Sequence, residues 1–197
     1  MHMAAAEVLR AAAFIDRDGV INEELNYVHR VEDFRLVAGA AEGLRRLADA
    51  GFELIVVTNQ AGIAKGLYTE EDFRELTRHM RAMLAQDGVE FLDVLHCPHH
   101  PQATVARWRV DCDCRKPAPG MILEAARRHR LDLSHSVLVG DKTSDTDAGR
   151  AAGLARTVLV ETGHVLPADA NNHADHCAVD LPAAADWILQ ELSPSHP

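Results

Sequence analysis

Apolar runs alternate with amphipathic stretches along most of this chain. The short apolar runs, each of which predicts a buried strand, lie at residues 11–15, 52–57, 91–96, 136–139 and 157–160. Apolar positions at helical spacing predict helices at residues 39–50, from Thr69 to about 84, at 121–130, at 145–152 and at 183–192. Strands that alternate with helices predict an α/β fold, a Rossmann-like three-layer sandwich with a central parallel sheet.

Two carboxylates follow the first predicted strand directly. In an extended backbone, residues two positions apart share a face, so Asp16 and Asp18 should lie together while Arg17 points the other way. Gly19 then allows a sharp turn. Two like charges held together need an offsetting partner, and a hard cation with oxygen ligands is one candidate. A helix N-cap or a solvated turn is the alternative for this motif taken alone.

Two later strands also end in polar residues. The strand at 52–57 ends at Thr58, and the strand at 136–139 opens into Gly140 and Asp141. Right-handed crossovers bring the carboxyl ends of parallel strands to one edge of the sheet, where open α/β sheets bind their ligands. We therefore expect one site that combines Asp16, Thr58 and Asp141.

Composition and charge limit the function classes. The 197 residues are 47% hydrophobic and 25% charged, which is typical of a globular protein, and we expect one domain over residues 1–197. The formal net charge of −10 argues against nucleic acid as the main partner. No stretch resembles a signal peptide or approaches the ~20 apolar residues of a membrane span, so we expect a cytoplasmic protein with reduced thiols and no membrane partner.

Three of the four cysteines lie in one polar loop, residues 97–114. The pairs Cys97/His99 and Cys112/Cys114 supply four soft ligands, which predicts a closed, structural zinc site that staples the loop. His99 fits better than His100, because Cys-x-His mirrors the later Cys-x-Cys. Reduced structural thiols are the alternative. For Cys177 we expect a buried or idle thiol, and for His129, His164 and His173 a solvated surface position.

The motifs resemble, in order, those of the haloacid dehalogenase superfamily of phosphatases. They are Asp16-x-Asp18-Gly19, Thr58-Asn59, Lys116 and Gly140-Asp141-x-x-x-Asp145. The resemblance implies that Asp16 is the nucleophile of an aspartyl-phosphate mechanism and that Asp18 is the general acid and base.

The same resemblance assigns the remaining parts of the site. It implies Mg²⁺ held by Asp16, Asp141 and the backbone carbonyl of Asp18. The Thr58 hydroxyl, the Asn59 backbone N–H and the Lys116 ammonium would contact the phosphoryl group. For Asp145 we expect a supporting role or a helix cap.

A narrower resemblance, to the heptose-bisphosphate phosphatase family, rests on the stretches VVTNQAGIAKG, CPHHP, CDCRKPAPGM and VGDK. It implies removal of the 7-phosphate of a heptose 1,7-bisphosphate, a small phosphorylated sugar. The related histidinol-phosphate phosphatases share the zinc loop and are the first alternative; a zinc-stapled binding module on an inactive fold is the second. Neither gap between motifs has room for a large cap domain. The residues expected to bind substrate are Glu24, Asn26, Tyr27, Asn59, Gln60, Arg115 and Lys142. The sequence leaves the oligomeric state open.

Overall fold

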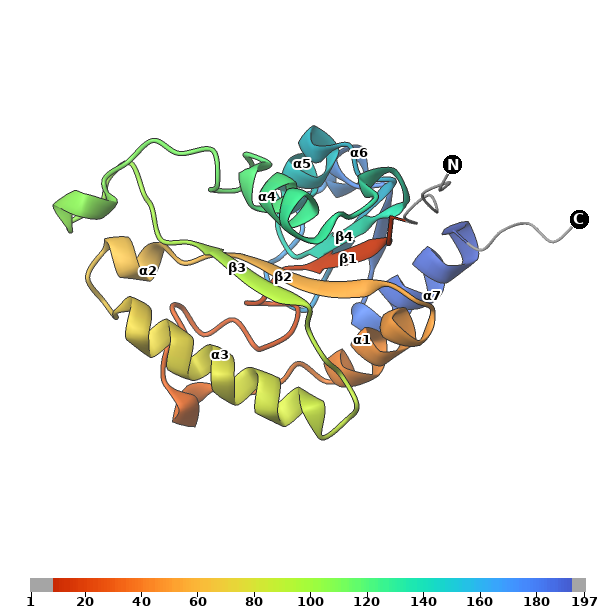
Figure 1. The fold of residues 1–197 in the computed structure, drawn as a ribbon, viewed down its shortest axis with the longest axis horizontal. Helices are drawn as coiled ribbons and strands as arrows, with labels where there is room; N and C mark the ends of the chain where they lie inside the picture. Colours follow the sequence, from red (N-terminus) through yellow and green to blue (C-terminus); the bar gives the residue numbers. More distant parts are fainter. Residues whose placement is uncertain (1–8, 193–197) are drawn as a thin grey trace, which may run out of the picture.

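The computed structural model describes residues 9–192. Its centre is a parallel six-stranded sheet in the order β3-β2-β1-β4-β5-β6 (Figure 1). The strands are β1 (Ala12–Ile15), β2 (Glu53–Asn59), β3 (Asp93–Cys97), β4 (Val137–Gly140), β5 (Arg156–Val160) and β6 (His176–Ala178). The predicted fold class is confirmed: the described chain forms a Rossmann-like sandwich without an inserted cap domain.

Helices cover both faces of the sheet. On one face lie α1 (Ala40–Asp49), α3 (Glu70–Ala85) and α7 (Leu181–Leu192), and on the other lie α4 (Gly120–His129), α5 (Thr143–Ala152) and α6 (Ala170–His173) (Figure 1). A short helix, α2 (Ala61–Ala64), follows β2. None of the helices in the described chain is long and apolar enough to cross a bilayer.

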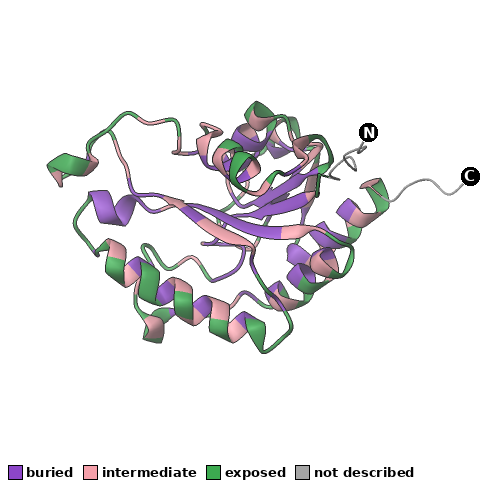
Figure 2. Cartoon of the chain, in the orientation of Figure 1, coloured by how far each residue is buried: buried purple, intermediate pink, exposed green. Residues whose placement is uncertain are grey.

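Alternation along each strand builds two cores. In β1, Ala13 and Ile15 contribute to the core beneath α1, α3 and α7, while Ala12 and Phe14 contribute to the core beneath α4 and α5. All four side chains are fully buried, which explains why β1 is a continuous apolar run rather than an alternating one. The sheet is buried throughout its centre, whereas the outer faces of the helices are exposed (Figure 2).

The tail contains a strand that the sequence pattern does not predict. Residues 161–180, for which the sequence pattern predicts no helix or strand, include α6 and β6, and β6 pairs in parallel with β5 from Val158 to Val160. The strand has only three residues, His176 to Ala178, so it carries no apolar run. Backbone pairing with β5 therefore determines it. The other predicted elements are present, with ends shifted by one or two residues; α5, for example, begins at Thr143 and α7 at Leu181.

Candidate active site

Three neighbouring strands deliver the polar residues of the site to one edge of the sheet. β1 pairs with β2 on one side and with β4 on the other, so their carboxyl ends are adjacent. Asp16 follows β1, Thr58 lies near the end of β2, and Asp141 follows β4. All three are at least 95% buried. The prediction that these strand ends share an edge is confirmed.

Lys116 inserts a buried ammonium group into this cluster. Its Nζ donates to Asp16 Oδ1 at 2.8 Å and to the carbonyl oxygen of Val57 at 2.7 Å, and it lies 2.7 Å from Asp145 Oδ1. Burial works against the charge, but Asp145 and Asp16 hold the pKa of the ammonium above its usual range. The ammonium therefore stays charged and neutralises part of the acidic cluster.

The side chain of Asn59 fixes the backbone that carries Lys116. Asn59 Nδ2 donates to the Lys116 carbonyl oxygen at 3.0 Å, and the Lys116 N–H donates to Asn59 Oδ1 at 3.1 Å. These reciprocal bonds join the end of β2 to Lys116, the second residue after the loop of residues 97–114. The side-chain amide of Asn59, a residue expected to bind substrate, is therefore already hydrogen-bonded within the protein.

Asp16 is surrounded by more negative than positive charge. Burial, with Asp145 and Asp141 adding to it, raises the pKa of Asp16 to about 7, although Lys116 opposes the shift. A nucleophilic carboxylate must be ionised to react. The site therefore needs a further cation beside Lys116 if Asp16 is to be fully ionised at neutral pH.

The acidic cluster has the donors that a divalent cation would need. Carboxylate oxygens of Asp16, Asp141 and Asp145 lie within 4.8 Å of one another. Asp141 Oδ1 is buried and has no hydrogen-bond partner, as expected of an atom reserved for a ligand. Hard oxygen donors in such a group suit Mg²⁺. The residues present therefore fit the ion that the resemblance implies.

Two glycines pack tightly around the carboxylate of Asp141. A Cβ atom would come within 2.4 Å of Asp141 Oδ2 at Gly19 and within 2.1 Å at Gly163. Gly19 also has a φ of +89°, which other residues rarely adopt. Both positions therefore need glycine for the backbone to approach this carboxylate.

Asp145 supports the cluster, as expected. Its Oδ2 accepts hydrogen bonds from the backbone N–H groups of Asp141 at 3.2 Å and Lys142 at 3.0 Å, at the start of α5. Its Oδ1 faces Lys116. Both carboxylate oxygens thus have protein partners, in contrast to Asp141.

Arg17 does not point away from Asp18, so that prediction is wrong. Its Nη2 lies 2.8 Å from both carboxylate oxygens of Asp18, and its Nε donates to Oδ1 at 3.2 Å. β1 ends at Ile15, so the alternation of an extended strand no longer applies at Arg17. The two carboxylates nevertheless line the same cavity.

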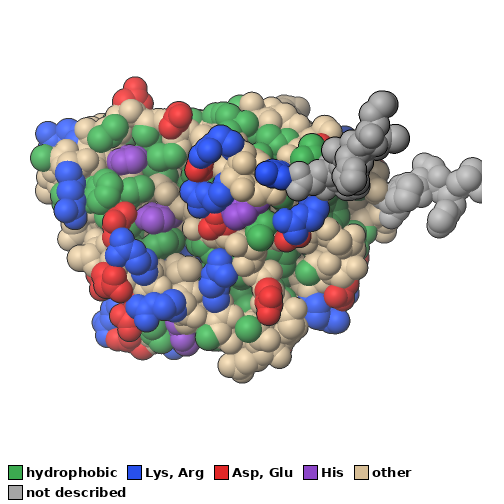
Figure 3. Space-filling view, viewed as in Figure 1, with side chains coloured by type: hydrophobic (Ala, Val, Ile, Leu, Met, Phe, Trp, Pro, Cys, Tyr) green, Lys and Arg blue, Asp and Glu red, His purple; other side chains and the backbone are tan. Residues whose placement is uncertain are grey.

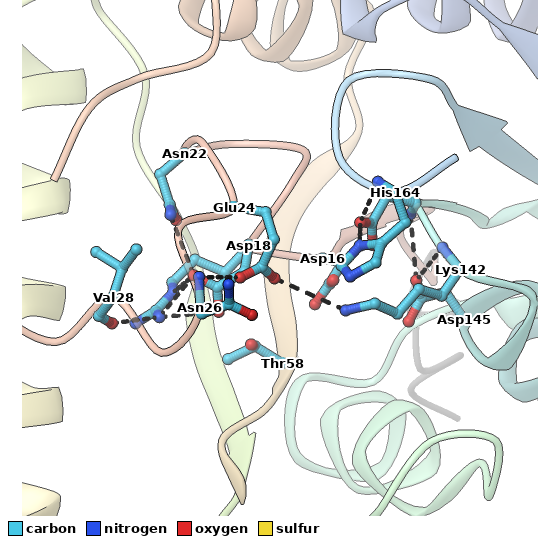
Figure 4. Close-up of polar contacts among 12 residues, drawn as sticks. Asp16, Asp18, Asn22, Glu24, Asn26, Val28, Thr58, Lys142, Asp145 and His164 are labelled. Atoms are coloured by element: carbon cyan, nitrogen blue, oxygen red, sulfur yellow. Dashed lines mark hydrogen bonds and ion pairs between the residues drawn. The ribbon is translucent and has the colours of Figure 1, made fainter. Parts of the chain in front are cut away.

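Asp18 accepts hydrogen bonds from several groups. Asn22 Nδ2 donates to Oδ1 at 3.1 Å (Figure 4), and Gln60 Nε2 donates to Oδ2 at 3.0 Å. Burial would raise the pKa of Asp18, but Arg17 together with the bonds from Asn22 and Gln60 holds it below the usual range of a carboxyl group. Asp18 is therefore ionised in the free protein. The Gln60 amide, like that of Asn59, is committed within the protein.

His164 is a residue of the site that sequence reasoning missed. Its Nδ1 lies 2.6 Å from Asp141 Oδ2, and its backbone N–H donates to the same oxygen at 3.2 Å (Figure 4). It follows the end of β5, so the strand-end rule that identified Asp141 could also have found it. The expectation of a solvated position is also wrong for His129, which pairs with Asp93 at 2.8 Å.

A cavity of about 510 Å³ opens over the cluster. It is lined by Asp16, Asp18, Thr58 and Lys116 and by every residue expected to bind substrate, namely Glu24, Asn26, Tyr27, Asn59, Gln60, Arg115 and Lys142. A larger cavity, about 620 Å³, lies between β3 and α4 and contains none of these residues. The smaller cavity is therefore the candidate active site.

The four residues expected to bind zinc lie together beside this cavity. Cys97 Sγ is 3.0 Å from Cys114 Sγ and 3.6 Å from Cys112 Sγ, and His99 Nδ1 is 3.3 Å from Cys114 Sγ. His100 instead accepts from the backbone N–H of Gln102. All four cysteines are free thiols, and Cys177 lies apart on β6. Three sulfurs and one imidazole nitrogen at this spacing fit a tetrahedral zinc site.

Comparisons with known proteins agree with this geometry. A family model described as HAD-hydrolase-like matches residues 113–184. A D-glycero-alpha-D-manno-heptose-1,7-bisphosphate 7-phosphatase from Photorhabdus laumondii is 50% identical over 152 residues, 77% of this chain and 83% of the relative. A D-glycero-beta-D-manno-heptose-1,7-bisphosphate 7-phosphatase from Escherichia coli K12 is 43% identical over 182 residues, 92% of this chain and 90% of the relative.

A solved structure is similar along nearly the same length. The crystal structure of a D,D-heptose 1,7-bisphosphate phosphatase from B. bronchiseptica, complexed with magnesium and phosphate, has a TM-score of 0.78 and 30% sequence identity. The match covers 92% of this chain and 99% of that chain. Sequence and fold comparisons thus point to one family.

Proposed function

Because the chain belongs to the D-glycero-D-manno-heptose-1,7-bisphosphate 7-phosphatase family of HAD-like hydrolases, we propose that it removes the 7-phosphate of this sugar in a Mg²⁺-dependent reaction. The observation that carries the proposal is the buried cluster at the sheet edge. There Asp16 lines the cavity with one oxygen on Lys116 and Asp141 beside it. These groups supply a nucleophile, a cation and the oxygen ligands for a metal ion, which suits phosphoryl transfer because that reaction depends on positioning and charge neutralisation.

In the first half-reaction an Asp16 oxygen attacks phosphorus, the bond from phosphorus to the C7 oxygen breaks, and Asp18 protonates the leaving alkoxide. In the second, Asp18 removes a proton from a water molecule that attacks the aspartyl-phosphate, which releases phosphate and restores Asp16. The Thr58 hydroxyl, the Asn59 N–H and Lys116 stabilise the charge on the phosphoryl oxygens.

Two metal ions complete the proposed enzyme. Asp16, Asp141 and the backbone carbonyl of Asp18 would hold Mg²⁺, which supplies neutralisation of the carboxylates and polarisation of a phosphoryl oxygen. Cys97, His99, Cys112 and Cys114 would hold a structural zinc ion, a set reserved for closed sites.

The second phosphate of the substrate needs cations away from the nucleophile. Arg115 and Lys142 line the same cavity, and Arg115 follows the loop of residues 97–114 while Lys142 follows β4. Lys142 Nζ lies 3.8 Å from Glu24 Oε2. Glu24 is the carboxylate that the ammonium group of histidinol phosphate would need, and its pairing with Lys142 therefore favours the bisphosphate.

The remaining alternatives fit less well. A binding module on an inactive fold would have no use for both the Asp18 network and the buried Lys116.

We further propose that residues 1–197 act as one cytoplasmic domain with no nucleic-acid partner. In support, cationic and anionic side chains are interspersed on the face shown in Figure 3, which presents no continuous basic surface.

A phosphate-release screen tests the function. The substrates are both anomers of heptose 1,7-bisphosphate, because relatives of each kind match the chain, together with histidinol phosphate and nucleoside monophosphates. We expect hydrolysis of a heptose bisphosphate, and none by folded Asp16→Asn, which lacks the nucleophile. A preference for histidinol phosphate, or normal turnover by Asp16→Asn, would contradict the proposal.

A further inference from the structure

Arg17 is a fully buried arginine that the proposed mechanism does not use. Only 1% of the residue is exposed, although its guanidinium group carries a charge that cannot be lost. Desolvating such a charge is costly unless a partner offsets the cost. Its ionised partner is Asp18, which it contacts through Nε and Nη2.

A second set of contacts ties Arg17 to the loop over the cavity. Its Nη2 also donates to the carbonyl oxygen of Val28 at 2.9 Å and lies 3.5 Å from Gln60 Oε1. The guanidinium carbon lies 5.7 Å from the centre of the Phe73 ring. Val28 is in the segment whose residues Glu24, Asn26 and Tyr27 line the cavity. Arg17 therefore contacts Asp18, the loop that contains Val28, and Phe73 of α3.

Purely structural packing does not explain this arrangement well. Nη1 of Arg17 is buried without a hydrogen-bond partner, so the protein leaves one donor unsatisfied. A site selected for stability alone would favour an apolar side chain in this position. The Nε and Nη2 donors, by contrast, constrain both oxygens of Asp18, and the direction of proton transfer depends on where those oxygens point.

We propose that Arg17 is a positioning residue that holds the Asp18 carboxyl group in the orientation needed to protonate the leaving alcohol. The proposal rests on the proposed function in assigning the acid role to Asp18. The proton moves from Asp18 to the oxygen that leaves phosphorus, and Arg17 pairs with the carboxylate that remains. A leaving group that needs no proton should be insensitive to this orientation.

The test compares two classes of substrate with Arg17→Met and Arg17→Lys. The measured quantity is kcat/KM, which covers the steps up to formation of the aspartyl-phosphate and so includes departure of the leaving group. Heptose bisphosphate supplies a poor alkoxide leaving group, and p-nitrophenyl phosphate supplies a good phenolate. Arg81→Met is the matched control, because Arg81 also donates to a backbone carbonyl, that of Phe91, but lies outside the cavity.

For both Arg17 variants we expect kcat/KM for the alkyl substrate to fall about 10- to 100-fold, the loss of a charge-assisted contact, with less than about a 3-fold change for the aryl substrate. The lysine variant should not restore the alkyl activity, because one ammonium cannot reproduce the planar fork. Arg81→Met should leave both values unchanged.

Equal losses on both substrates, or no loss on the alkyl substrate, would overturn the proposal. Wild-type activity in Arg17→Lys would also overturn it, because charge alone would then suffice. Melting temperatures identify variants that fail to fold, and if Arg17→Met does not fold, Arg17→Lys decides. Any alkyl phosphate that the enzyme hydrolyses can replace the heptose, so an error in the assigned sugar leaves this test intact.

Discussion

Replacing Lys116 with methionine tests how the acidic cluster is held together. The Lys116 side chain is 2% exposed and contacts Asp16, Asp145 and the carbonyl oxygen of Val57 at 2.7–2.8 Å. Methionine keeps much of the volume but removes the charge. The variant therefore leaves two buried carboxylates facing each other without the ammonium group between them.

The expected loss of stability is large. Removing one partner of a buried ion pair costs about 3–5 kcal/mol, because the other charge stays buried without compensation. The free energy of unfolding of a whole domain is only about 5–15 kcal/mol. In the folded wild-type protein the pKa of Asp16 is about 7, already above the value of 3.8 for a free carboxyl group, and loss of Lys116 should raise this pKa further. The folded variant therefore binds a proton at Asp16 more tightly than the unfolded chain does. The deficit should therefore shrink as the pH falls toward 4.

Magnesium should restore part of the lost stability, because the proposed Mg²⁺ site consists of the folded carboxylates that have lost their ammonium partner. A ligand at about 100 times its Kd adds about 2.7 kcal/mol to the free energy of unfolding. Urea denaturation in EDTA and in Mg²⁺ measures both effects. Turnover should be lost in either condition, since the proposed mechanism also uses Lys116 to stabilise the phosphoryl group.

Lys142→Met is the matched control. The Lys142 side chain is 42% exposed and faces Glu24 at 3.8 Å, so its replacement should change the free energy of unfolding by less than about 1 kcal/mol. A Lys116→Met protein as stable in EDTA at neutral pH as the wild type would refute the reasoning, since the carboxylates would then not depend on the ammonium group.

Three further predictions concern the metals, the substrate and pH. Cys112→Ser should abolish the one zinc ion expected per chain, measured by elemental analysis, and lower the melting temperature, because metal binding contributes folding free energy. Arg115→Ala should lower kcat/KM for the bisphosphate about 10- to 100-fold but change p-nitrophenyl phosphate hydrolysis little. In EDTA, the free energy of unfolding should fall as the pH rises from about 4 to about 7, because folded Asp16 retains a proton that the unfolded chain releases, whereas Mg²⁺ should suppress this trend.

The sequence pattern predicts the strand-end residues because burial on both faces makes the central strands continuous apolar runs. β1, β2 and β4 are such runs, and the polar residue at each end is therefore conspicuous. The cluster of Cys97, His99, Cys112 and Cys114 is visible in the sequence for a similar reason, because three cysteines and a histidine in one polar segment are typical of a metal site. These features depend on residue type and order alone.

Contacts between residues that are distant in the sequence cannot be predicted from residue type and order. The bonds between Asn59 and Lys116 join residues 57 positions apart, and they arise only when the zinc loop returns to the end of β2. The direction of Arg17 depends on where β1 stops. β6 exists because β5 offers it an edge, not because of its own composition. In each case the local structure depends on contacts with another part of the fold, and the periodicity of apolar positions carries no information about those contacts.

The opposite pKa shifts of Asp16 and Asp18 show that spacing alone does not assign their roles. Asp16 is buried among Asp141 and Asp145, which favour its protonated form, whereas Arg17 favours the ionised form of Asp18. Asp18 thus begins in the ionised form, which the proposed second half-reaction requires. For the first half-reaction it must carry a proton. A phosphate group that enters the cavity brings negative charge, which raises the pKa of a nearby carboxyl group. In the proposed mechanism, substrate binding would therefore shift Asp18 toward the protonated form that protonates the leaving alcohol.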